Sequence, residues 1–279
     1  MSQNKTGTRI LVSVLAIPFI VLASYFGGVL FLIFVLGIAL ISFFEFTTMV
    51  KSKSTEPNIF AGMLSTAAIV LNIYFNWVDF FTLAIIISAV FLMLELYHNK
   101  SSAILNLGVT YLGIFYIGLF SASILGIREL YILSDQLYEQ GGFLIISIFV
   151  TIWICDSAAF FLGTAFGKHK LFPRVSPKKS WEGALAGFVF AVLTMIAAQL
   201  LVLDFLTIFD AIIIGAIVGT IGQYGDLIES LIKRDAEVKD SSALIPGHGG
   251  VFDRFDSLLF ASPFIYLYLT FFISLFSSN

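Results

Sequence analysis

Long apolar segments with almost no charges fill most of this sequence, and they constrain the fold more than any other feature. A helix needs about 20 apolar residues to cross a bilayer, and backbone groups in hydrocarbon must pair within a helix or a closed barrel. The segments are unbroken rather than alternating, which excludes a transmembrane barrel. Charged residues make up only 12% of the chain, too few to cover a water-exposed surface, which excludes a soluble domain. We therefore predict an all-α, polytopic integral membrane protein with nine membrane-spanning helices, at residues 10–26, 28–46, 60–76, 78–97, 104–126, 143–166, 183–203, 208–231 and 257–276.

The first apolar segment, 10–26, follows Lys5 and Arg9 and so has the basic flank of a secretory signal peptide. No small-x-small cleavage site follows it, and the second apolar segment begins at once. We therefore expect the first segment to be retained as a helix.

The basic residues predict the orientation, because Lys and Arg gather in the cytoplasmic segments of membrane proteins. With a cytoplasmic N-terminus, the spans leave only Arg128 of the 15 basic residues on the outer side, and one span more or fewer would scramble this division. We expect a protein of the cell (inner) membrane with an external C-terminus. The basic residues placed in the cytoplasm are Lys5, Arg9, Lys51, Lys53, Lys100, Lys168, Lys170, Arg174, Lys178, Lys179, Lys233, Arg234, Lys239 and Arg254.

Most of the informative polar residues lie in the second half of the chain. No internal repeat or long soluble segment interrupts residues 1–279, so we expect a single membrane-embedded domain. Its chemistry should lie in residues 150–260, at an active site that faces the cytoplasm. The one cysteine, Cys155, excludes an internal disulfide and a cysteine metal cluster, and its apolar surroundings indicate a packing residue.

Asp156 lies deep in the sixth apolar segment, about eleven residues or roughly 16 Å of helix before Gly167. A carboxylate at that depth costs roughly 3 kcal/mol unless it faces protein or water and has a partner. The residue therefore indicates either a polar contact between helices or a place in a polar cavity.

The segment 168–183 carries five basic residues and one acid, Glu182. Such a charge is typical of a loop that binds anionic lipid head groups. Its run Ser176-Pro177-Lys178-Lys179-Ser180 lies just before an apolar span, near a helix N-terminus that favours anions, and so also fits a phosphate-binding loop. The segment is not a P-loop, because the glycine spacing before Lys168 and the residue after it do not match that motif.

Asp226 and Glu229 end the eighth apolar segment and lie three residues apart, hence on one face of a helix. Two such carboxylates repel each other unless a basic residue or a cation joins them. A divalent ion with oxygen ligands is the natural candidate.

The segment 233–256 holds four basic and five acidic residues around the turn Pro246-Gly247-His248-Gly249-Gly250. This mixture fits a site for metal and phosphate, since glycine lets the backbone approach a ligand closely. Asp253 and Asp256 are candidate metal ligands if their segment is helical, and helix N-capping and a solvated charged loop are the alternatives. His248 is a candidate base, phosphate donor or turn residue.

Taken together, these motifs resemble the sequence signature of the CDP-diacylglycerol synthases, also called phosphatidate cytidylyltransferases. The resemblance holds at every motif position and covers the C-terminal half in motif and the whole chain in length and hydropathy. The matching elements are Ser230-Leu231-Ile232-Lys233-Arg234, Lys239-Asp240 and Pro246-Gly247-His248-Gly249-Gly250-Val251-Phe252-Asp253-Arg254-Phe255-Asp256, preceded by Asp156 with Ala159-Phe160 and Gly163, and by Ser176-Pro177-Lys178-Lys179-Ser180 with Glu182-Gly183.

The resemblance implies an enzyme that converts CTP and phosphatidate into CDP-diacylglycerol and pyrophosphate. It also implies a requirement for Mg²⁺, with a second cation as an open alternative, and a homodimer that meets membrane lipid but no nucleic acid. The family's metal centre is built from aspartates that match Asp226 and Asp253. We assign as catalytic Asp226, Asp253, Lys239 and His248; as phosphate-binding Ser176, Lys178, Lys179, Lys233, Arg234 and Arg254; as metal-binding Asp226, Asp253, Asp256 and Asp240; and, in a polar cavity, Asp156, Glu182 and Glu229.

Two other classes of protein remain as alternatives. A transporter would need a polar pathway through both halves of the membrane, whereas the polar residues here crowd one face. A CTP-dependent lipid kinase would use the same metal and phosphates, but it would release CDP instead of pyrophosphate.

The orientation predicts which side of the membrane the loops 167–182 and 232–256 reach. In a Cys155→Ser background, Lys170→Cys and Val238→Cys should react with a membrane-impermeant maleimide only from the cytoplasmic side. Labelling of either position from outside intact cells would overturn the topology.

Overall fold

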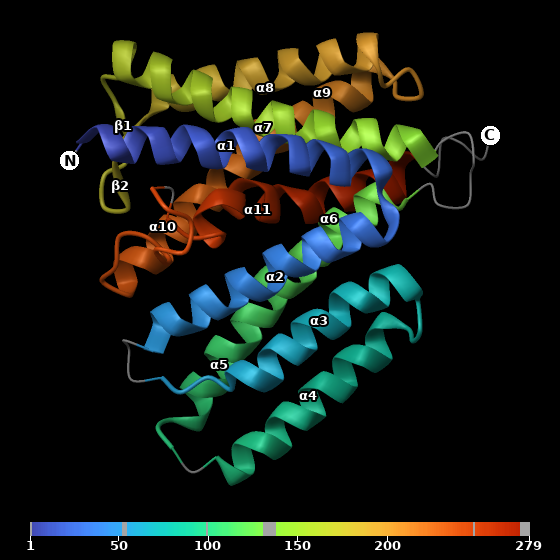
Figure 1. The fold of residues 1–279 in the computed structure, drawn as a ribbon, viewed down its shortest axis with the longest axis vertical. Helices are drawn as coiled ribbons and strands as arrows, with labels where there is room; N and C mark the ends of the chain where they lie inside the picture. The colour runs from blue at the N-terminus through green and yellow to red at the C-terminus, as the bar shows by residue number, and fades with distance from the viewer. Residues whose placement is uncertain (1, 52–54, 99, 131–137, 248, 274–279) are drawn as a thin grey trace.

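The computed structural model describes residues 2–51, 55–98, 100–130, 138–247 and 249–273. Helices form almost all of these segments, and one small two-stranded sheet accompanies them (Figure 1). Three stretches, labelled η, are π-helical. The elements in chain order are α1 (Ser2–Phe26), α2 (Gly28–Val50), α3 (Ile59–Phe75), α4 (Phe80–Tyr97), α5 (Ala103–Gly113), η2 (Ile114–Leu119), α6 (Phe120–Arg128), α7 (Tyr138–Phe166), β1 (Lys170–Phe172), β2 (Ser176–Ser180), α8 (Trp181–Leu201), α9 (Ile208–Ile217), η3 (Val218–Gly222), α10 (Gln223–Asp235), α11 (Phe252–Tyr268) and η4 (Leu269–Ile273).

Each predicted apolar segment coincides with helix over most of its length. Within the described ranges, seven helices are long and apolar enough to cross a membrane, and Val12–Phe26 and Ile59–Phe75 are shorter apolar helices. The prediction of a helical integral membrane protein is confirmed at this level. The strands β1 and β2 depart from a purely helical chain, because the predicted loop at 168–183 folds into an antiparallel hairpin.

Polar residues fix where several helices begin. The Asp79 carboxylate accepts a hydrogen bond from Thr82 N at the start of α4, and Thr207 and Asp210 form a reciprocal capping box at the start of α9. At the start of α8, the Ser180 hydroxyl accepts a hydrogen bond from Gly183 N. These side chains satisfy N–H groups that the first helical turn leaves without a partner.

The helices pack into a continuous assembly that Figure 1 shows from one side. The first group consists of α1, α7, α8 and α9, in which α7 packs along α8 and α8 along α9. In a second group α10 and α6 both pack against α11, while α2 packs on α3. The β1–β2 hairpin, the start of α1 and helix α10 lie toward the same side of the molecule (Figure 1). We call this side the hairpin end.

Glycines bring the packed helices close together. A methyl group on Gly163 of α7 would lie 3.1 Å from the Cα of Gly183 in α8, and one on Gly187 would lie 3.1 Å from the carbonyl oxygen of Cys155. These glycines form helix-packing faces, because small residues let two helix backbones approach closely. Cys155 is buried at this contact, as its apolar surroundings predicted.

Arg128 joins the ends of two helices on the side opposite the hairpin end. Its guanidinium is fully buried and donates hydrogen bonds to the carbonyl oxygens of Ser24 at 2.6 Å and Tyr25 at 2.7 Å, near the end of α1. A third hydrogen bond reaches the carbonyl of Tyr138 at 3.2 Å, and the ring of Tyr138 lies 4.4 Å from the guanidinium carbon. Carbonyls at the end of a helix carry partial negative charge, so this cation is stabilised where it is buried.

The contact between α8 and α9 predicts a stability difference between two glycines. A methyl on Gly215 would lie 2.7 Å from the Cα of Val192, whereas one on Gly108 of α5 meets nothing within 4 Å. Gly215→Ala should therefore cost about 1–3 kcal/mol through overpacking, and Gly108→Ala should be neutral or stabilising by up to about 1 kcal/mol. Thermal unfolding in detergent measures both, and equal midpoints for the two variants would contradict the packing argument.

Candidate active site

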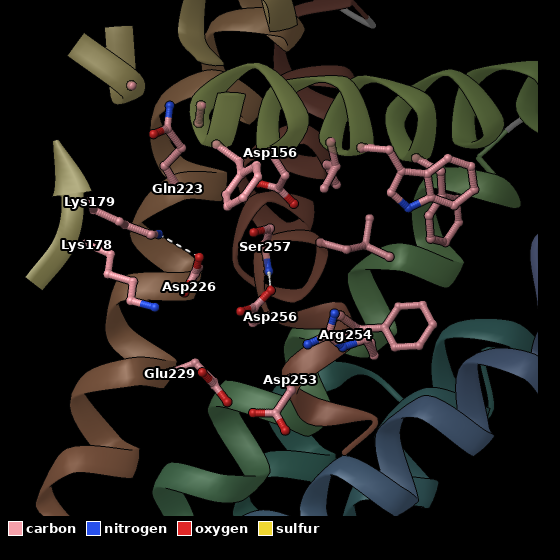
Figure 2. A pocket seen from close by; sticks show the side chains of 18 of the residues that line it. Asp156, Lys178, Lys179, Gln223, Asp226, Glu229, Asp253, Arg254, Asp256 and Ser257 are labelled. Atoms are coloured by element: carbon pink, nitrogen blue, oxygen red, sulfur yellow. Dashed lines mark hydrogen bonds and ion pairs between the residues drawn. The ribbon is translucent and has the colours of Figure 1, made fainter. Parts of the chain in front are cut away.

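A cavity of about 740 Å³ lies at the hairpin end, between α1, α7, β2, α8, α10 and α11 (Figure 2). Part of its wall is apolar, formed by α1 and α7, and the rest carries charged side chains drawn from segments far apart in the sequence. Its polar lining includes Asp156, Lys178, Lys179, Gln223, Asp226, Glu229, Lys233, Asp240, Asp253, Arg254 and Asp256.

Three carboxylates in this cavity form one cluster. Asp226 and Glu229 come from α10 and Asp256 from α11, and each offers an oxygen within 4.8 Å of the other two. The prediction that Asp226 and Glu229 share one helical face is therefore confirmed. Figure 2 shows Asp226 and Asp256 facing each other across the gap between the two helices.

Glu229 is the most deeply buried member of the cluster, with no exposed surface. Its Oε2 lies 2.7 Å from the Lys233 ammonium, and neither of its oxygens accepts a well-aligned hydrogen bond from the residues described. Carboxylate oxygens gathered this closely are the kind of ligand set that binds a hard divalent cation such as Mg²⁺. The cluster of Asp226, Glu229 and Asp256 therefore fits the metal that the sequence predicts.

Asp253 lines the same cavity but has a different set of partners. Its Oδ1 accepts a hydrogen bond from Lys233 Nζ at 2.7 Å, and its Oδ2 accepts from Gly250 N at 2.8 Å and from both the backbone N and the hydroxyl of Ser241. Both oxygens are thus engaged by the protein. The structure brings Asp226 together with Asp256 and Glu229, and it leaves Asp253 and Asp240 outside that cluster.

The glycines of the turn let the chain approach the protein's own carboxylates. Gly249 has φ +83°, a left-handed conformation that favours glycine, and a methyl there would lie 2.6 Å from Asp253 Oδ2. A methyl on Gly250 would overlap Ser241 Oγ and Glu45 Oε2. From the sequence we expected the backbone at these glycines to lie close to a ligand. In the structure it lies close to the side chains of Asp253 and Glu45.

Basic side chains reach the cavity from three directions. Lys179 on β2 lies 2.6 Å from Asp226 Oδ2, and Lys178 lines the cavity beside it (Figure 2). Lys233 comes from α10 and Arg254 from α11.

The other two predicted phosphate-binding residues and the predicted catalytic Lys239 lie outside the cavity lining. Ser176 starts β2, Arg234 is exposed and donates to the carbonyl of Val238, and Lys239 is exposed in the loop that follows α10. His248 lies outside the described residues.

The two remaining acids have separate surroundings. Asp156 points from α7 into the cavity (Figure 2). Of the two alternatives that its sequence position left open, this corresponds to a place in a polar cavity. Glu182 is not part of the lining. Its carboxylate lies 2.7 Å from His169 Nδ1 and so ties the start of α8 to the residue before β1.

Sequence reasoning missed three polar residues that the structure places at or behind the site. Gln223 lines the cavity and donates to the carbonyl of Ala184, while Ser241 bonds Asp253. Glu45 is buried in α2 and bonds the loop before α11. A signal for Glu45 was present, because a carboxylate inside the apolar segment 28–46 requires a partner.

The chain is similar to known proteins over nearly its whole length. The model of the cytidylyltransferase family matches residues 7–272. A phosphatidate cytidylyltransferase of Staphylococcus haemolyticus is 31% identical over 267 residues, which is 95% of this chain and 98% of that protein. Those of Haemophilus influenzae and Bacillus subtilis are 46% and 44% identical over shorter stretches, which span 53% and 46% of the respective proteins.

The carboxylate cluster predicts a cation site that can be measured without any substrate. The purified protein should bind Mn²⁺, and Asp226→Asn, Glu229→Gln and Asp256→Asn should each weaken that binding at least about tenfold, since each removes a charged oxygen ligand. Paramagnetic resonance of free Mn²⁺ gives the dissociation constants. Asp204→Asn, at an exposed acid between α8 and α9, is the control. Unchanged affinity in all three cluster variants would mean that the cluster is not a cation site.

Proposed function

This chain belongs to the cytidylyltransferase family, and from that premise we propose that it transfers the cytidylyl group of CTP to phosphatidate, giving CDP-diacylglycerol and pyrophosphate for phospholipid synthesis. The observation that carries the proposal is the composition of the cavity wall. One side is apolar, with Ala16, Ile17 and Ile20 of α1, and the other gathers lysines, an arginine and clustered carboxylates. Such a cavity suits two substrates together, a lipid with a phosphate head group and a nucleoside triphosphate.

The charge of the cavity supports a bound cation. Its described lining has six carboxylates and four basic side chains, a net charge of −2, and both proposed substrates are polyanions. We propose that Asp226, Glu229 and Asp256 hold Mg²⁺, with Asp253 and Asp240 as further candidate ligands and a second cation beside it. When bound, Mg²⁺ would neutralise phosphate oxygens and orient the triphosphate.

The basic side chains of the chain bind and orient the phosphates in this proposal. Lys178 and Lys179 reach the cavity on a strand, so the pairing of β1 with β2 fixes where their ammonium groups lie. Arg254 offers a planar guanidinium from the opposite wall, suited to phosphate oxygens. Ser176 and Arg234 are proposed to bind phosphate as well, and Lys239 and His248 are proposed as catalytic residues.

The chemistry needs no covalent intermediate with the protein. An oxygen of the phosphatidate phosphate attacks the α-phosphorus of CTP in line and forms the new P–O bond. The bond between the α-phosphorus and the bridging oxygen breaks, and pyrophosphate leaves with the electron pair. The side chains lower the barrier by holding the two anions in reach of each other and by stabilising the charge that develops.

The remaining proposals concern the surroundings of the site. We propose that all nine apolar helices span the inner membrane as parts of a single domain, with the N-terminus and the cavity facing the cytoplasm. The split of basic residues supports that orientation. A homodimer is proposed from the family resemblance, and the mass of the detergent-solubilised protein measured by light scattering tests it.

The proposed reaction is tested by its products. Purified protein in detergent, supplied with CTP labelled at the α-phosphate, phosphatidate and Mg²⁺, should place the label in CDP-diacylglycerol and release unlabelled pyrophosphate. Release of labelled CDP with a phosphorylated lipid would instead identify a lipid kinase. A protein that consumes no CTP under these conditions would contradict both.

The catalytic assignment predicts large losses from isosteric changes. Asp226→Asn and Asp253→Asn should each lower kcat at least about a hundredfold, roughly 2.7 kcal/mol of barrier, because each keeps the volume but removes a negative charge next to the substrates. If the two act as one unit, the double variant should be little worse than either single variant. Asp204→Asn should match the wild type. Activities above about a tenth of wild type in both single variants would exclude the pair as the metal centre.

A further inference from the structure

Glu45 is a buried carboxylate of α2 that binds the loop leading into α11. The side chain is 3% exposed and lies about 200 residues before its partners in the sequence. Its Oε1 accepts hydrogen bonds from Ser242 Oγ and from Val251 N at 3.1 Å. Its Oε2 accepts from Ser241 Oγ at 3.0 Å and from Phe252 N at 2.8 Å. All four partners are donors, and the single hydroxyl proton of Ser241 is shared between Glu45 and Asp253.

These donors include the N–H of Phe252, the first residue of α11, and the N–H of Val251 just before it. N–H groups at a helix start have no partner within the helix, and the helix dipole favours a negative charge there. Asp253 holds the same loop from the other side, and Ser241 Oγ lies 3.0 Å from both Glu45 Oε2 and Asp253 Oδ2. The loop is therefore clamped between one carboxylate from α2 and one from α11 itself.

Aromatic packing fixes the same turn of helix. Phe252 is fully buried, with its ring centroid 6.4 Å from that of Phe46, the residue after Glu45, and 5.7 Å from that of Tyr116. Asp253 follows Phe252 directly, and Asp256 lies one turn further along α11. Any shift of the helix start would carry both aspartates with it.

We propose that Glu45 is a positioning residue for cytidylyl transfer, because it fixes the start of α11 and thereby places Asp253 and Asp256 opposite the acids of α10. The inference rests on the proposed function for its catalytic consequence. Glu45 itself does not line the cavity, so it acts through the residues it holds. Displacements of about 1 Å in a catalytic constellation are enough for large losses of rate.

Glutamine at position 45 is a sharp test, because it keeps the size of the side chain. A hydroxyl partner can rotate to suit a carboxamide, but a backbone N–H can only donate. Each oxygen of Glu45 accepts one backbone N–H, from Val251 or from Phe252. The NH₂ group of glutamine must therefore face one of these two N–H groups, and that hydrogen bond is lost in either orientation of the amide.

The first experiment separates positioning from general stability. Glu45→Gln should lower kcat at least about tenfold, leave the KM for CTP within about threefold, and weaken Mn²⁺ binding at least about tenfold, as loss of a supporting hydrogen bond does at metal sites. Glu129→Gln is the matched control, because Glu129 is also buried and accepts a hydrogen bond from the first residue of a helix, Gly28 N. The control should lower the thermal midpoint only. A Glu45→Gln enzyme with wild-type kcat and Mn²⁺ affinity per folded molecule would overturn the proposal.

A second measurement does not depend on catalysis or on metal. Hydrogen exchange of the peptide that contains Val251 and Phe252 should be faster in Glu45→Gln than in the wild type, and unchanged in Glu129→Gln. Unchanged exchange in Glu45→Gln would also overturn the proposal. Should the wild type make no CDP-diacylglycerol, the proposed function fails, while the exchange and Mn²⁺ measurements still decide the role of Glu45.

A milder variant covers the case in which Glu45→Gln does not fold. Ser242→Ala removes one hydroxyl donor to Glu45 and leaves both backbone hydrogen bonds in place. It should change the same quantities as Glu45→Gln but by less, with kcat and Mn²⁺ affinity each lowered about threefold. If Glu45→Gln fails to fold and Ser242→Ala equals the wild type in all three measurements, the proposal is wrong.

Discussion

The Lys233 ammonium is the group on which the arrangement of the site depends. It lies 2.7 Å from Glu229 on its own helix and 2.7 Å from Asp253 on the neighbouring helix, and its side chain is only 12% exposed. Without it, two buried carboxylates would face each other with no cation between them, and leaving a buried charge unpaired costs about 3–5 kcal/mol. Since α10 and α11 together carry the carboxylate cluster, this one lysine holds the two halves of the cluster at a fixed separation.

The backbone reinforces what the ion pairs hold. A methyl on Gly225 of α10 would lie 2.6 Å from the carbonyl oxygen of Asp256 and 2.7 Å from the Cβ of Phe260, so α10 and α11 touch almost backbone to backbone at the cluster. Just before α10, the π-helical segment η3 interrupts the regular helical repeat, and such segments often occur at functional sites. The charged groups are thus carried by helices that have little freedom to slide past each other.

Hydropathy and motif spacing predicted the parts of this protein that depend on local sequence. The apolar segments became helices, and Asp226 and Glu229 share a face because a three-residue spacing on a helix dictates it. What pairs with Lys233 or Lys179 depends on which helices meet, and no local pattern contains that information. Asp253 looked equivalent to Asp256, yet a loop serine, a glycine N–H and a lysine engage both of its oxygens.

Glu45 is a second case in which the sequence does not reveal the partners of a side chain. A single acidic residue in an apolar segment indicates that its side chain has a polar partner. The sequence does not tell which partner, because the backbone groups that Glu45 binds lie about 200 residues away. The hairpin at 170–180 was also beyond reach, because its strands are short and rich in lysine, which is depleted in strands.

The contacts of Arg128 have a consequence for the order in which the chain assembles. Its carbonyl partners belong to Ser24, Tyr25 and Tyr138, so this buried cation has its full set only once the start of α7 has been synthesised. Until then, the Arg128 side chain at the end of α6 lacks its hydrogen bond to the carbonyl of Tyr138. A charged group without all of its partners is unfavourable in an apolar medium. Helix α1 also forms one wall of the cavity. Helix α1 is therefore joined, through Arg128 and through the cavity wall, to segments that are synthesised much later in the chain.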